Sequence, residues 1–175
     1  MKTLTLRVLL ATAALAAAGQ AAAQSSSTQS TTGTGTIVQP LTLTKNNDLA
    51  FGSVVRPSSG TNTVAVNETT GARTLSGGGN AAPITSTTSR ATYTVDGEGG
   101  QAFSITVPAS FNMTRSGGVE TLAVTLVSTA ATGTLSGSAG AAGSAAFGVG
   151  GSFPLSSTTA TGAYSGSFNV TVAYN

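Results

Sequence analysis

The most regular hydrophobic pattern in the chain lies between Gly162 and Asn175. From Tyr164 onward, every second residue is aromatic, β-branched or glycine, and the residues between them are small or polar. This period-2 alternation predicts a half-buried β-strand. Because it ends the chain, the strand either pairs on both sides or leaves a sheet edge that another chain can use. The residues assigned to this assembly strand are Gly162, Tyr164, Phe168, Val170, Val172 and Tyr174.

Shorter runs along the chain predict further strands. In the first, over 36–44, Ile37, Leu41 and Leu43 share one face, and Pro40 indicates an edge or a bulge. The glycine-rich stretch 132–149 predicts only weak strands. The best internal hairpin joins 91–95 to 102–107, and the other strands are expected at 49–55, 63–66, 72–76 and 122–127.

These short strands, separated by turns of glycine, asparagine and serine, predict an all-β fold. The architecture expected is an antiparallel, immunoglobulin-like β-sandwich. No window beyond residue 23 shows the i, i+3, i+4 spacing of an amphipathic helix.

The first residues predict export. Lys2 and Arg7 precede an apolar run that ends at Ala18, too short to span a bilayer, and small residues follow up to Ala23. This order is typical of a secretory signal peptide, assigned to 1–23. The protein is therefore expected in the periplasm in transit, and finally on the cell surface or outside the cell. Segment 24–35 holds no large apolar residue and predicts a flexible extension before a single domain over 36–175.

The charge of the chain adds little to these predictions. Only 7% of the residues are charged, and without Lys2 and Arg7 five basic and five acidic residues remain. A mature chain near zero net charge has no basic patch for nucleic acid, and no membrane span follows the leader. Low charge also suits an assembled or surface-attached protein, because net charge keeps proteins apart.

The chain is poor in reactive groups. It contains no histidine and no cysteine, so neither a histidine base, a thiol nucleophile nor a disulfide is available. Asp96 and Glu98 are the best paired carboxylates, and such a pair can bind calcium weakly or flank a glycosidic bond. The favoured interpretation is that Asp96 makes the hairpin turn and Glu98 is solvated. We expect no enzyme activity, no cofactor and no metal.

Six segments form an ordered set: 36–44, 49–54, 70–78, 93–98, 103–108 and 162–175. Together they resemble the bacterial domain-of-unknown-function family 4402 over essentially the whole mature chain. More distantly, the tail looks like the last strand of chaperone–usher pilins, including spore-coat-U-like pilins. In those pilins a tyrosine is penultimate, as Tyr174 is here, and a glycine stands about fourteen from the end, as Gly162 does.

The likeness and the edge strand together suggest an exported structural subunit of a pilus-like or fimbria-like fibre. Its assembly would use β-strand complementation, with Ile37, Leu41 and Leu43 as donor candidates. The partners implied are other copies or related subunits, a periplasmic chaperone and an outer-membrane usher. The alternative is a self-contained secreted or outer-surface sandwich with an adhesion or matrix role, in which 36–44 pairs within its own domain. A sugar-binding module or hydrolase fits worse, because the chain has no tryptophan and three tyrosines.

Overall fold

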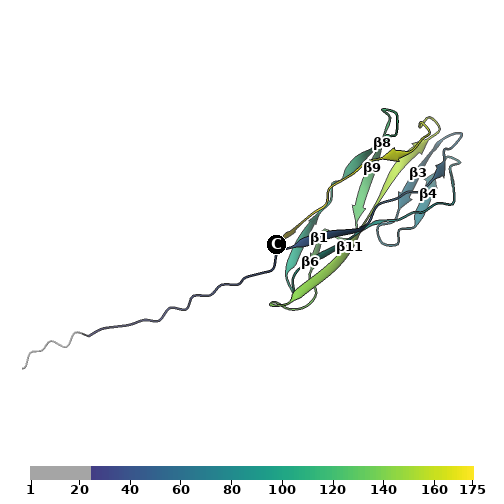
Figure 1. The fold of residues 1–175 in the computed structure, drawn as a ribbon. Helices are drawn as coiled ribbons and strands as arrows, with labels where there is room; N and C mark the ends of the chain where they lie inside the picture. Colours follow the sequence, from purple (N-terminus) through teal and green to yellow (C-terminus); the bar gives the residue numbers. More distant parts are fainter. Residues whose placement is uncertain (1–24) are drawn as a thin grey trace, which may run out of the picture. The chain divides into compact units, whose positions relative to one another are not determined.

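The computed structural model describes residues 25–175 (Figure 1). The signal peptide predicted for 1–23 lies outside the described residues. The chain divides into Met1–Thr36 and Ile37–Asn175. In the first part, residues 25–36 are exposed and form neither helix nor strand.

The second part is an all-β domain, as the alternating pattern predicts. All its strand pairs are antiparallel, and the described residues contain no helix. The strands are β1 (Thr42–Asn47), β2 (Val54–Val55), β3 (Thr61–Val66), β4 (Arg73–Gly77), β5 (Ala82–Pro83), β6 (Ala91–Glu98), β7 (Ala102–Thr106), β8 (Ser110–Arg115), β9 (Thr121–Ser128), β10 (Thr132–Thr134), β11 (Ala142–Ser156), β12 (Tyr164–Ser165) and β13 (Thr171–Tyr174).

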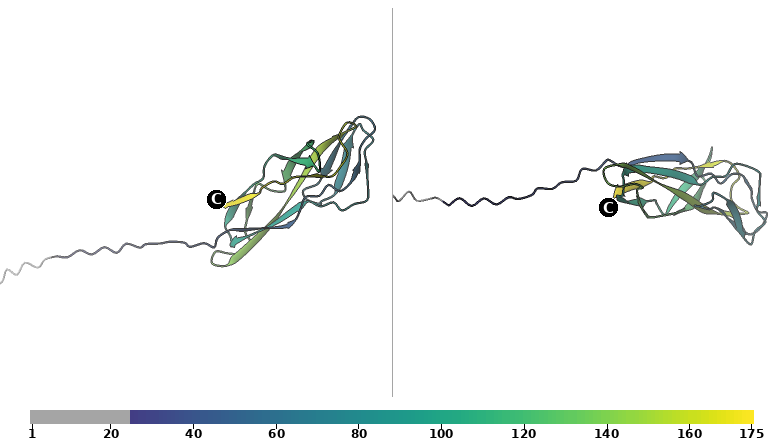
Figure 2. Two further views of the ribbon diagram at one scale, coloured as in Figure 1. Left: turned by 45° about the horizontal axis from the view of Figure 1, so that its top comes forward. Right: turned by 90° about the horizontal axis from the view of Figure 1, so that it is seen from below.

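The larger sheet is built on β11, which runs the length of the domain (Figures 1 and 2). β6 pairs with its first half and β3 with its second half. β9 pairs with its middle on the opposite edge, because Val149 has both Ala91 of β6 and Ser128 of β9 as neighbours. The main path of the sheet is β1-β6-β11-β9-β8-β12, and β4 extends it beyond β3.

A second, smaller sheet has the order β10-β7-β13, and β2 and β5 form a separate two-stranded ribbon. The two sheets share one hydrophobic core. Phe103 of β7 and Leu135, just after β10, are fully buried together with Val95, Val124 and Val149 of the larger sheet. Two antiparallel layers around one core make the domain a β-sandwich, as expected.

The glycines of β11 explain why the sequence pattern does not predict one long strand there. A β-carbon on Gly150 would lie 2.3 Å from the carbonyl oxygen of Val66, and one on Gly148 would lie 2.4 Å from that of Glu68. Glycine inside a strand often marks such a close backbone approach. The prediction of weak strands over 132–149 is confirmed for the short β10 but wrong for 142–149, which belongs to β11 and is continuous with it over fifteen residues.

The predicted hairpin of 91–95 with 102–107 is also wrong. β6 pairs with β1 and β11, whereas β7 pairs with β10 and β13, so the turn between them carries the chain from one sheet to the other. The turn itself is Gly99–Gly100, with Gly100 at φ +74°. By contrast, the prediction of a strand at 122–127 is confirmed by β9, which lies between β11 and β8.

Candidate assembly surface

The C-terminal segment is two short strands, where the sequence predicts one long one. β12 pairs with β8 in the larger sheet, and β13 pairs with β7 in the smaller sheet. Residues 166–170 between them belong to no strand, and none of the described backbone hydrogen bonds involves them. The segment therefore crosses from one layer to the other and leaves a stretch of backbone without partners.

The predicted face of this segment is nevertheless right. Tyr164, Phe168, Val170, Val172 and Tyr174 are half-buried, and the residues between them are exposed. The ring of Phe168 packs at 5.1 Å, centroid to centroid, on that of Phe111 in β8. Because the alternation continues through the unpaired residues, inward side chains hold the segment where backbone pairing is missing.

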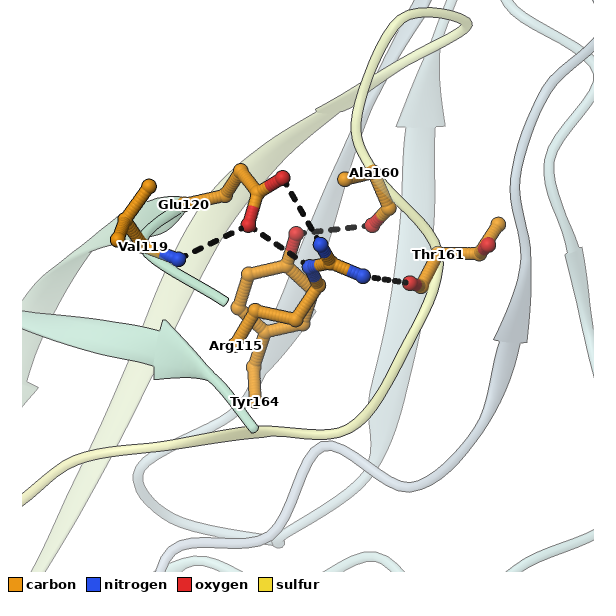
Figure 3. Close-up of polar contacts among 6 residues, drawn as sticks. All are labelled: Arg115, Val119, Glu120, Ala160, Thr161 and Tyr164. Carbon is orange, nitrogen blue, oxygen red and sulfur yellow. Dashed lines mark hydrogen bonds and ion pairs between the residues drawn. The ribbon is translucent and has the colours of Figure 1, made fainter. Parts of the chain in front are cut away.

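A polar cluster fixes the start of the segment (Figure 3). Arg115 of β8 donates from Nε and Nη2 to the two carboxylate oxygens of Glu120, at 2.8 and 3.0 Å, and from Nη1 to the carbonyl of Thr161 at 3.3 Å. The Tyr164 hydroxyl donates to the carbonyl of Ala160 at 2.8 Å. Glu120 raises the pKa of Arg115, chiefly through these hydrogen bonds, and Arg115 lowers the pKa of Glu120 by the same contact.

The same segment lines two neighbouring cavities, of about 540 and 290 Å³, which share Leu49, Phe51, Met113 and Tyr164. We call these two cavities together the edge groove. Residues 49–54 and 159–164 line the larger cavity, and Lys45 and residues 164–168 line the smaller one. Its apolar side chains include Phe111, Leu122, Phe153 and Leu155.

The edge groove lies where the larger sheet is open. β1 and β12 are the two ends of the six-strand path, yet Lys45 of β1 and Tyr164 of β12 line the same cavity. The sheet is therefore curved so far that its ends approach each other without pairing. Among the described strands, β1 pairs only with β6 and β12 only with β8, so each presents an edge. An unpaired edge is a template for a further strand.

The donor candidates lie in two environments. Ile37 is 97% exposed, whereas Leu41 and Leu43 are half-buried against the core of their own domain. Leu43 is held in β1, which pairs with β6 of the same chain from Thr42↔Asp96 onward. Leu41 and Leu43 can reach another copy only if this pairing opens.

The interpretation of the two loop carboxylates is wrong. Asp96 lies inside β6 rather than in a turn, and Glu98 is only 3% exposed rather than solvated. Glu98 accepts hydrogen bonds from the backbone N–H groups of Gln39, at 3.3 Å, and Gly140. Sequence alone carries no signal for this burial, because both donors come from distant segments. Within residues 25–175, no group of three acidic, histidine or cysteine side chains is placed to hold a metal ion.

The strands form an antiparallel β-sandwich, and the larger of its two sheets is open at its ends. The chain belongs to the family described as Domain of unknown function (DUF4402), whose model matches residues 41–174. That match covers β1 to β13, including the edge groove and both ends of the open sheet. No curated protein and no solved structure matches the chain. In the described part of the chain, no helix is long and apolar enough to cross a membrane.

Proposed function

We propose that this protein is an exported structural subunit of a bacterial surface fibre, and that copies join by adding a β-strand at the edge groove. The observation that carries the proposal is that two unpaired sheet edges, β1 and β12, line one cavity. An added strand gains affinity from main-chain hydrogen bonds and specificity from alternate side chains in pockets. The proposal assigns no catalysis to the chain.

The acceptor is the C-terminal segment. Residues 166–170 offer backbone groups without partners, and the half-buried faces of Phe168 and Val170 set the register. The occupant is the strand of a second copy that carries Ile37, Leu41 and Leu43. Ile37 is already exposed, and Leu41 and Leu43 become available when β1 leaves β6. A periplasmic chaperone would occupy the same groove before assembly, and an outer-membrane usher would direct the exchange.

The second candidate is a self-contained outer-surface sandwich with an adhesion or matrix role. The observation that favours it is the pairing of β1 with β6 inside one chain, which runs over five register pairs. In that case the groove stays without a strand and the protein acts as a monomer.

Disulfide trapping between copies separates the two candidates, because the chain has no cysteine of its own. Two differently tagged copies, one with Ile37→Cys and one with Ser167→Cys, are expressed together and recovered from the cell surface. The proposal predicts a cross-linked dimer and larger oligomers carrying both tags, because Ser167 lines the groove.

The matched control replaces Ile37→Cys by Val119→Cys, which is similarly exposed, at 89%, but lies on the β8–β9 turn outside the groove. This pair is expected to give little cross-linking. Negative-stain microscopy with an antibody to the chain tests for fibres in the same samples. The fibre proposal fails if the surface protein is monomeric in both pairs and the antibody labels no filament.

A further inference from the structure

Glu98 is a buried carboxylate with no basic partner among the described residues. It closes β6 and is 3% exposed, and neither of the two described ion pairs includes it. Its two oxygens accept from backbone groups instead, one from Gln39 and one from Gly140. A buried charge that depends on backbone donors is stable only while those donors stay in place.

Tyr174 completes the arrangement from the other end of the chain. Its hydroxyl donates to the carbonyl of Gln39 at 2.8 Å and accepts from the backbone N–H of Glu98 at 2.7 Å. Gly97 makes room for this, because a β-carbon there would lie 2.4 Å from the Tyr174 oxygen. The C-terminus accordingly lies beside the beginning of β1 in each view (Figures 1 and 2).

Both backbone groups of Gln39 are thus held by side chains: its N–H by Glu98 and its carbonyl by Tyr174. The next residue, Pro40, has no N–H to contribute, and β1 begins only at Thr42. Removal of Gln39 would leave the Glu98 carboxylate and the Tyr174 hydroxyl each short of a partner at once. Linked polar groups of this kind are stable when complete and unfavourable when partly satisfied.

We propose that Glu98, Tyr174 and Gln39 form a clasp that decides whether β1 and the residues 37–41 before it stay on their own domain or are released to a second copy. This inference rests on the proposed function, because it assigns the control of strand exchange to one cluster. The clasp joins the donor candidates to Tyr174, the last inward residue of the acceptor segment. Opening of the clasp therefore frees the donor strand and the end of the acceptor segment together.

Hydrogen exchange on Tyr174→Phe tests the clasp. The ring stays and only the hydroxyl is lost, so β1 should open more often. We expect amide exchange over Thr42–Asn47 to be roughly tenfold faster or more than in the native protein, because the variant loses two hydrogen bonds of ordinary strength. Ser128→Ala is the control, because it also removes a hydroxyl, which bonds the carbonyl of Ala130 at 2.8 Å, but lies outside the edge groove and should leave exchange in β1 unchanged.

Glu98→Gln is the second variant, in case Tyr174→Phe does not fold. Glutamine keeps the shape and one oxygen acceptor but loses the charge and one acceptor, so exchange in β1 should again rise. If β1 exchanges at the native rate in every folded variant, the clasp does not hold β1 and the inference is wrong.

The Ile37→Cys and Ser167→Cys pair then links the clasp to assembly. With Tyr174→Phe added to both copies, the rate of cross-linking should rise severalfold, and with Ser128→Ala it should not. Faster exchange in β1 without faster cross-linking overturns the control of strand release, even if fibres form. If exchange in β1 becomes faster but no pair cross-links in any background, the clasp holds β1 only within its own chain, and the fibre proposal is wrong.

Discussion

The extent of backbone pairing in β11 and in the C-terminal segment 164–174 is the opposite of what their sequences predict. β11 has glycine or alanine at seven of its fifteen positions, yet it is the longest strand and pairs along nearly its whole length. The C-terminal segment has the most regular alternation in the chain, yet it pairs only through two residues of β12 and four of β13. Alternation of apolar and polar residues therefore predicts which face of a strand is buried, but it does not predict whether the backbone pairs with neighbouring strands.

The physical reason lies in what approaches each strand. The backbone of β3 and of the turn that follows it lies so close to β11 at Gly150 and Gly148 that no side chain fits. The C-terminal segment instead carries large side chains that fill the core, and residues 166–170 run alongside β8 without a ladder. Close backbone approach places β11 at the centre of the sheet, whereas residues 166–170 are held by side chains and keep an unpaired backbone, which is the kind of edge that a further strand can use.

The largest expected effect compares one phenylalanine from each region. Phe147 of β11 is buried and stacks on Tyr93 at 5.1 Å, whereas Phe168 is half-buried against Phe111 at the same distance. Phe147→Ala should lower the free energy of unfolding by about 3–5 kcal/mol, and Phe168→Ala by roughly half as much. Urea unfolding of both variants measures this. Equal losses would mean that the C-terminal segment is as firmly fixed as the centre of the sheet.

An intermediate effect is expected from added methyl groups. Gly150→Ala should lower the free energy of unfolding by about 1–3 kcal/mol, because its β-carbon meets backbone at 2.3 and 2.6 Å. Gly166→Ala meets the carbonyl of Asn112 at 2.3 Å but should cost less, since that unpaired segment can shift. Gly78→Ala is the control, with nothing within 4 Å, and should change stability by less than about 0.5 kcal/mol. A larger loss at Gly166 than at Gly150 would contradict this ranking.

The smallest effect concerns the cluster that fixes the start of the segment. Because Arg115 lowers the pKa of Glu120 in the folded state, the carboxylate stabilises the fold above its unfolded pKa, near 4.5, and loses this contribution as the pH falls. Glu120→Gln should therefore be slightly less stable than the native protein at neutral pH, and the gap should close in acid. Thermal unfolding between pH 7 and pH 3 measures the gap. A gap that is constant with pH would show that the ion pair contributes nothing to the fold.

Several features of the fold follow from local sequence. The alternation around Val64 and Val66 predicts a half-buried strand, and both side chains are buried in β3. The inward positions of the C-terminal segment follow in the same way, because side-chain direction has a period of two wherever the backbone is extended. These predictions need only the residues of one strand.

The clasp could not be predicted in this way. Glu98 looks like a solvated loop carboxylate because Gln39, Gly140 and Tyr174, which surround it, are distant in the sequence. The open sheet is a further example. Whether β1 and β12 meet, pair or leave a groove depends on how far a sheet curves, and curvature belongs to all of its strands together.

The fold class, the buried face of most strands and the lack of histidine and cysteine chemistry follow from the amino-acid sequence alone. Those properties depend on residue type and on period, both of which are local. Three further properties come from the packing of the whole domain: a glycine-rich stretch is the centre of the larger sheet, the best-patterned strand is split between two layers, and Glu98 is buried. These outcomes depend on close contacts between segments far apart in the chain, and local pattern carries no record of which backbone will approach.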